Sequence, residues 1–205
     1  KKKIFRDFPD VLSDEYKENA KNNAKALAAR KDDPMMIGYF LRNEPSWAFV
    51  DNLVLADEVL YNPERTVCKE KLIEALKEKY QTVEALNIEW NTKFTDFDDL
   101  YQPIRDASAK SEAAKEDQKT FSKEMLRAYV EIPSKACRGV DPNHIILGMR
   151  WAWISDPDLA TGWENFDVFS INCYAVDPTE AISHVVELGV DLPVMIGEFH
   201  FGALD

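Results

Sequence analysis

Two glutamates stand where buried strands are expected to end, and their carboxyl groups could act as a pair. Glu44 follows the apolar run 35–41 and precedes Pro45, whose ring disfavours helical backbone at the residue before it. Glu198 follows a Pro-Val-Met-Ile-Gly segment, and Gly197 leaves room for close approach of a substrate. Each glutamate has a simpler alternative role: Glu44 as a helix cap, and Glu198 as half of a structural ion pair.

A pair of carboxyl groups at neighbouring strand ends suits hydrolysis of a glycosidic bond. One group must be ionised to act as a nucleophile, and the other must hold a proton at the working pH. Each carboxylate raises the proton affinity of the other, which separates the two roles. A retaining enzyme needs the groups ~5–5.5 Å apart and an inverting one ~6.5–9.5 Å, and the sequence leaves that distance open.

Strand patterns alternate with helix patterns along the chain. Continuous apolar runs predict parallel strands buried on both faces at 35–41, 145–149, 166–173 and 194–196, the last continuing toward Glu198. Helical periodicity and end signals predict helices at 13–30, 46–60, 66–79, 82–90, 106–138 (disturbed at Pro133) and 178–188 (closed by Gly189). Segment 91–105 is rich in aromatic residues and Asp and is predicted to form a structured loop. This alternation predicts an α/β fold with parallel strands and flanking helices, either a partial (β/α)8 TIM barrel or a small doubly wound sheet.

Further polar and aromatic residues follow the predicted strands, at the end where barrels place their sites. Arg150 follows the second strand and is a candidate for substrate binding. Trp151, Trp153 and Trp163 could stack on sugar rings, and Trp153 is preferred because it lies beyond the strand end. Core packing is the alternative for each tryptophan.

His200 lies two residues after Glu198, so both side chains would share a face if the strand continued that far. It could bind substrate hydroxyls or tune Glu198, and the alternative is a structural histidine.

Two longer stretches carry a family resemblance. Asn43-Glu44-Pro45 and the strand-ending Glu198 resemble the clan-A retaining glycosidases. Segment 76–92, with Glu-Ala-Leu-Asn-Ile-Glu-Trp-Asn-Thr at its end, resembles an insertion of family 42 β-galactosidases and family 50 β-agarases. Segment 196–205 is most similar to the agarases. The resemblance covers strands four to seven, so residues 1–205 are expected to be the C-terminal part of a TIM-barrel catalytic domain.

The resemblance implies a role for each matching residue. Glu44 would be the general acid/base and Glu198 the nucleophile. Asn43 would hydrogen-bond the sugar 2-hydroxyl, and Tyr174 would hydrogen-bond the nucleophile. The implied function is agarase-like hydrolysis of a galactan-type polysaccharide with retention of configuration. The alternatives are an exo-β-galactosidase acting on oligosaccharides and an inactive fragment or non-catalytic carbohydrate-binding scaffold.

Composition narrows the expected partners. A net charge of −12 and a pI near 4.8 disfavour nucleic acid and anionic membrane surfaces, while a neutral poly- or oligosaccharide is compatible. The three cysteines and three histidines form no metal-binding motif, and no nucleotide motif occurs, so neither a metal nor a cofactor is expected. The abrupt start suggests a piece of a longer protein, which is expected to be secreted or periplasmic although the sequence leaves localisation unknown. Such a piece is expected to self-associate through open sheet edges.

Overall fold

The computed structural model describes residues 2–200, and they form two compact units. The first unit contains the chain up to Lys17 and Asn52–Ala128, and the second contains Glu18–Asp51 and the chain from Tyr129 onward. The fold is mixed α/β and mostly helical. Its strands are β1 (Lys3–Phe5), β2 (Phe8–Pro9), β3 (Gly38–Tyr39), β4 (Ile145–Ile146), β5 (Phe169–Asn172) and β6 (Val194–Glu198). Its α-helices are α1 (Asp14–Ala24), α2 (Leu55–Tyr61), α3 (Val67–Tyr80), α4 (Val83–Trp90), α5 (Glu112–Val140) and α6 (Thr179–Glu187).

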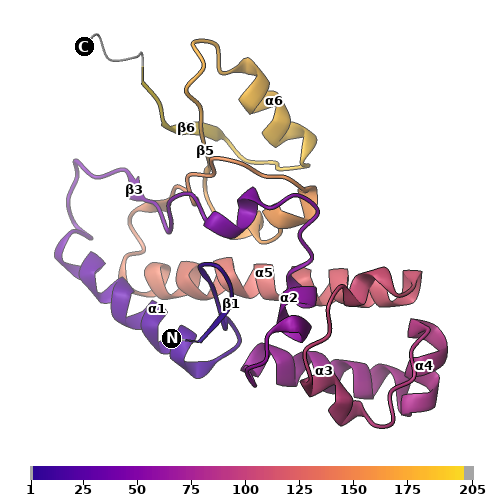
Figure 1. Ribbon diagram of the computed structural model, residues 1–205. Coiled ribbons are helices and arrows are strands. Elements are labelled where there is room, and N and C mark those ends of the chain that lie inside the picture. Colours follow the sequence, from indigo (N-terminus) through magenta and orange to yellow (C-terminus); the bar gives the residue numbers. More distant parts are fainter. Residues whose placement is uncertain (1, 201–205) are drawn as a thin grey trace. The chain divides into compact units, whose positions relative to one another are not determined.

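Parallel strand pairs organise the second unit. β3 pairs with β4, and β5 pairs with β6, with α6 connecting the last two (Figure 1). A parallel bridge between Trp151 and Ile171 links the end of β4 to β5. The strands of this unit, β3 to β6, therefore follow one another in chain order, and their carboxyl ends point the same way. This arrangement agrees with the predicted α/β class and brings the residues after β3, β4, β5 and β6 to one edge.

The first unit is built mainly from helices. Thr66 and Thr82 cap α3 and α4 by accepting hydrogen bonds from backbone N–H groups of the first turn. The Asp117 carboxylate accepts hydrogen bonds from Tyr80 and from the indole of Trp90. Burial lowers the pKa of Lys69 to about 8, and its ammonium donates to backbone carbonyls of three residues. The unit also holds the antiparallel β1–β2 pair, which the sequence pattern did not predict.

The predicted helix over 46–60 is wrong in its middle. A 3-10 turn covers Ser46–Phe49, extended backbone follows at Val50, and α2 begins only at Leu55. The break coincides with β-branched Val50 and with Asn52, which adopts a left-handed conformation at φ 56°. The apolar residues of this segment therefore belong to two short elements, the 3-10 turn and α2.

The predicted strand over 35–41 is also shorter and less buried than expected. Met35 is 88% exposed and Ile37 is 70% exposed, so the run is not buried on both faces. Backbone hydrogen bonds nevertheless join this segment to β4 on both sides of Gly38–Tyr39, ending with Leu41 N–H donating to the Gly148 carbonyl at 2.9 Å. This pairing delivers the chain to Glu44.

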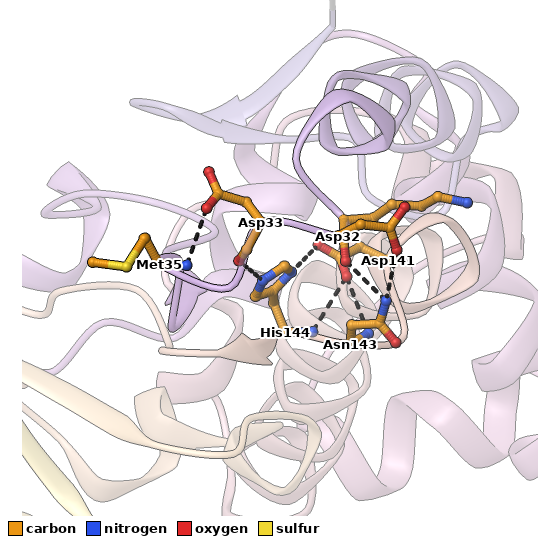
Figure 2. Close-up of polar contacts among 7 residues, drawn as sticks. Asp32, Asp33, Met35, Asp141, Asn143 and His144 are labelled. Carbon is orange, nitrogen blue, oxygen red and sulfur yellow. Dashed lines mark hydrogen bonds and ion pairs between the residues drawn. The ribbon is translucent and has the colours of Figure 1, made fainter.

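A polar cluster fixes the loop before β3 to the turn before β4 (Figure 2). His144 contacts the Asp141 carboxylate at 2.8 Å through Nδ1 and the Asp33 carbonyl at 3.0 Å through Nε2. The Asn143 side chain donates to the Lys31 carbonyl at 2.8 Å. Because both ring nitrogens of His144 face acceptors, these contacts raise its pKa. The cluster ties together the two segments that lead into the first parallel pair.

Three predicted helices agree well with the structure and two need a correction. The helices expected at 66–79, 82–90 and 178–188 are α3, α4 and α6. The helix expected at 13–30 is α1 as far as Ala24 and then a 3-10 helix over Lys25–Ala29. The long helix expected at 106–138 is α5, which begins later and continues through Pro133. Within residues 2–200, none of the helices combines the length and the apolar character needed to cross a membrane.

Candidate active site

Glu44 lies just beyond the β3–β4 pairing. Its backbone N–H donates to the Arg150 carbonyl at 3.2 Å, which attaches the end of one strand segment to the end of the next. Both residues have left-handed backbone, with φ of 45° for Glu44 and 44° for Arg150. Such conformations are uncommon for residues other than glycine and accumulate at functional sites. The side chain of Glu44 is partly buried.

Glu198 is the last residue of β6 and is surrounded by donors. The Tyr174 hydroxyl donates to its Oε1, and Arg150 Nη1 lies 3.6 Å from its Oε2. The carboxylate acceptor raises the pKa of Tyr174 to about 12, so the phenol remains a donor. The structure thus brings Tyr174 and Glu198 together, as the sequence analysis expected.

Asn172, at the end of β5, joins the two glutamates. Its Nδ2 donates to Glu44 Oε1 at 2.8 Å and contacts Glu198 Oε2 at 3.5 Å. These two oxygens therefore cannot be farther apart than the sum of the two distances, about 6.3 Å. Sequence reasoning did not select Asn172. The available signal was an amide at the end of a strand whose residues are all buried, because a buried polar group needs a partner.

Gly197 makes room for the Arg150 side chain. A Cβ added at Gly197 would lie 2.8 Å from Arg150 Cγ, closer than side chains tolerate. Arg150 also lies over the Phe40 ring, with its guanidinium carbon 5.0 Å from the ring centre. The sequence analysis associated the space beside Gly197 with the approach of a substrate. In the structure, the Arg150 side chain fills this space and faces Glu198.

The remaining candidates differ in how the structure places them. β6 ends at Glu198, so the strand does not continue to His200 and the alternation argument for that residue is wrong. The His200 ring nevertheless lies 5.0 Å from the Tyr174 ring. Asn43 is exposed, and Trp153 is 54% exposed beyond β4, whereas Trp151 is buried in the core between Trp47 and Phe169.

The site is a carboxylate pair with neutral and cationic donors around it. No group of three or more potential metal ligands occurs among His, Cys, Asp and Glu of the described part of the chain.

Comparison with known proteins identifies the family. Residues 2–196 match the profile of glycoside hydrolase family 42, described as Beta-galactosidase, and the chain belongs to that family. It is also similar to β-agarase B of Vibrio sp. (strain JT0107), with 29% identity over 212 residues. The sequence resemblance to agarases and family 42 is thereby confirmed.

Solved structures give the same relationship in three dimensions. The chain resembles the crystal structure of an agarase with a TM-score of 0.79 and 29% identity, and an exo-β-agarase with a TM-score of 0.81 and 26% identity. These matches cover 97% and 96% of this chain but 29% and 28% of the other chains. The match to β-agarase B covers 97% of this chain and 22% of that protein. The chain thus corresponds to a part of larger glycoside hydrolases.

Proposed function

We propose that this chain carries the catalytic carboxylates of a retaining β-glycosidase that hydrolyses a galactan-type polysaccharide, as agarases do. The observation that carries the proposal is the Asn172 bridge, which limits the linked oxygens of Glu44 and Glu198 to about 6.3 Å. That limit is compatible with the ~5–5.5 Å separation of the carboxyl groups in retaining enzymes. We further propose that residues 1–205 form the C-terminal part of a TIM-barrel catalytic domain.

The surroundings of the two carboxyl groups support different roles. Three donors face Glu198: the Tyr174 hydroxyl, the Arg150 guanidinium and, at the longest distance, the Asn172 amide. Glu44 accepts from Asn172 alone among the side-chain contacts described for it. Donors favour the charged form of a carboxyl group, and a nucleophile must be charged. This asymmetry favours Glu198 as nucleophile and Glu44 as acid/base.

The reaction proceeds in two displacements. In the first, the Glu198 carboxylate bonds to the anomeric carbon, the glycosidic C–O bond breaks, and Glu44 gives its proton to the departing oxygen. In the second, Glu44 takes a proton from water, the water oxygen bonds to the anomeric carbon, and the bond to Glu198 breaks. The tyrosine and arginine contacts stabilise Glu198 as the charge returns to it.

Azide rescue in the intact protein tests both roles. Glu44→Ala should lower kcat/KM on agarose by ~10²–10⁴-fold, the usual contribution of general acid catalysis. It should retain glycosylation by an activated dinitrophenyl β-galactoside, and azide should then yield a β-glycosyl azide. Glu198→Gly with azide should yield the α-azide. Exposed Glu187→Gln is the matched control. Near-normal agarose hydrolysis by either active-site variant would refute its assigned role.

Exo-β-galactosidase activity on oligosaccharides is the second candidate, favoured by the description of the matching family profile. Release of galactose from short oligosaccharides, with no cleavage of agarose, would select it. If the intact protein hydrolysed neither agarose nor aryl β-galactosides, a non-catalytic carbohydrate-binding scaffold would replace both enzyme proposals.

A further inference from the structure

We infer that Asn172 is a positioning residue that sets the spacing of the two carboxyl groups and assigns the catalytic proton to Oε2 of Glu44. The inference rests on the proposed function and extends it to a residue with no assigned role. Asn172 is only 6% exposed. Its amide nitrogen has two hydrogens, and it donates to one carboxylate oxygen of each glutamate. One side chain thus contacts both carboxyl groups of the proposed reaction.

The backbone around Asn172 leaves the amide little freedom. Its N–H donates to the Trp151 carbonyl at 2.6 Å, and the next N–H, of Cys173, donates to the Glu198 carbonyl at 3.0 Å. The β5–β6 register also shifts here, so that Asn172 pairs with Glu198 directly. The ends of three strand segments therefore hold the residue that bridges the carboxyl groups.

The carboxyl groups in turn fix the orientation of the amide. Asn172 Oδ1 is buried and has no hydrogen-bond partner among residues 2–200. Turning the amide over would place this oxygen against Glu198, which is ionised as the proposed nucleophile and offers no hydrogen to share. The amide therefore remains a donor to both groups.

This donor determines where Glu44 carries its proton. Since Oε1 already accepts from Asn172 at 2.8 Å, the acid form of Glu44 carries its proton on Oε2. Proton transfer to the leaving group ionises Glu44, and the contact with Asn172 becomes a charge-assisted hydrogen bond, which is stronger. Asn172 thus stabilises the product of proton transfer more than its starting state, which is the condition for accelerating the step.

Kinetics of Asn172→Ala in the intact protein provide the first test. For an aryl β-galactoside with a poor leaving group, kcat/KM should fall by roughly 10–100-fold, because protonation of the leaving oxygen is impaired. The loss should be smaller for the dinitrophenyl substrate, and the pH profile should move to higher pH because a donor to both ionised carboxyl groups is gone. Asn165→Ala, elsewhere in the same unit, is the control. Equal losses on both substrates with an unmoved pH profile would overturn the inference.

A double-mutant cycle in thermal unfolding gives a test that needs no activity. At a pH where Glu44 and Glu198 are both ionised, the two carboxylates repel each other more strongly without the bridge, so Glu44→Gln should be more favourable in the Asn172→Ala background than in wild type. The Tm changes should therefore be non-additive, whereas Glu44→Gln with Asn165→Ala should be additive. Additivity for Asn172 and Glu44 would refute the bridge. A wild-type protein that hydrolysed no galactoside would refute the proposed function, and the cycle would still decide whether Asn172 couples the two groups.

Discussion

Tyr174 and Glu198 form a hydrogen-bonded pair in which the acceptor changes the pKa of the donor. The Glu198 carboxylate raises the pKa of Tyr174 to about 12. We expect Tyr174→Phe to lower kcat/KM by roughly 10–100-fold, the usual effect of losing a hydrogen bond to a charged group. Difference titration at 295 nm between wild type and this variant should place the pKa of Tyr174 at about 12, well beyond the ordinary tyrosine value of ~10. Glu198→Gln should lower it, and an ionisation near 10 in wild type would contradict the pairing.

Gly197 offers a sharper steric test. Gly197→Ala places a methyl group against Arg150 Cγ, so the guanidinium must move away from Glu198. We expect kcat/KM to fall by ~10-fold or more, since the charged partner of Glu198, the proposed nucleophile, is displaced. Gly139→Ala in α5 is the matched control, because a Cβ there meets nothing within 4 Å. That change should raise stability by ~0.5–1 kcal/mol and leave activity unaltered, as urea unfolding and kinetics will show.

Part of the candidate site could be predicted from the sequence, because the sequence shows both the type of these residues and their position after a predicted strand. Glu44, Glu198 and Tyr174 each follow an apolar run, and the structure brings them together, while their catalytic roles stay predictions. Asn172 escaped because its importance lies in contacts with residues 128 and 26 positions away. Those contacts depend on strand order and on the register shift in β6, which single-strand patterns do not contain.

At the scale of elements, local signals predicted the helices better than the strands. Thr66 and Thr82 mark helix starts through their own hydrogen bonds, and α3 and α4 lie where periodicity placed them. β3 is short because its pairing with β4 covers only Gly38 and Tyr39. The extended break at Val50 likewise depends on tertiary context, since the surrounding apolar spacing is compatible with a continuous helix.

The cluster around His144 predicts a stability that depends on pH. The hydrogen bonds to the Asp33 carbonyl and Asp141 raise the pKa of His144, so its contribution is present below ~6.5 and is lost as pH rises through the raised value. Burial opposes ionisation of Asp141, but hydrogen bonds from His144 and Asn143 lower its pKa overall, so the pair weakens again when pH falls through that value. His144→Phe should therefore reduce the urea midpoint more at pH 5 than at pH 9.

Asn143→Ala serves as the comparison for this element. It removes the hydrogen bond to the Lys31 carbonyl without removing an ionisable group. Its loss of stability should be nearly the same at pH 5 and pH 9. If His144→Phe showed the same flat response, the charged form of His144 would have no part in holding the loop before β3.

At the scale of the whole molecule, the 205-residue chain exposes surfaces that favour association. Val176 is 93% exposed and Met35 is 88% exposed. Among residues 2–200, β3 pairs only with β4 and β6 only with β5, which leaves one edge of each outer strand open. Open edges and apolar patches recruit other chains. Light scattering of this chain should show concentration-dependent self-association, and a stable monomer at high concentration would contradict the prediction.

The same chain should be a poor enzyme by itself. It spans 22% of β-agarase B and about 29% of a solved agarase, and a (β/α)8 barrel ordinarily needs about 250 residues. We expect its turnover on agarose to be far below the ~1–10³ s⁻¹ typical of enzymes. Ordinary turnover by the 205-residue chain would show that catalysis does not need the remaining strands of a complete barrel.

The left-handed backbone at Glu44 and Arg150 places selection for stability in conflict with selection for activity. Each such residue costs of order 1–3 kcal/mol, and glycine would relieve that cost. A laboratory selection for heat resistance alone should therefore enrich glycine at both positions and discard two side chains of the proposed active site. Selection that also demands turnover should keep them and gather its stabilising substitutions elsewhere. The strain would then mark these two positions as ones that a search for stability should leave untouched.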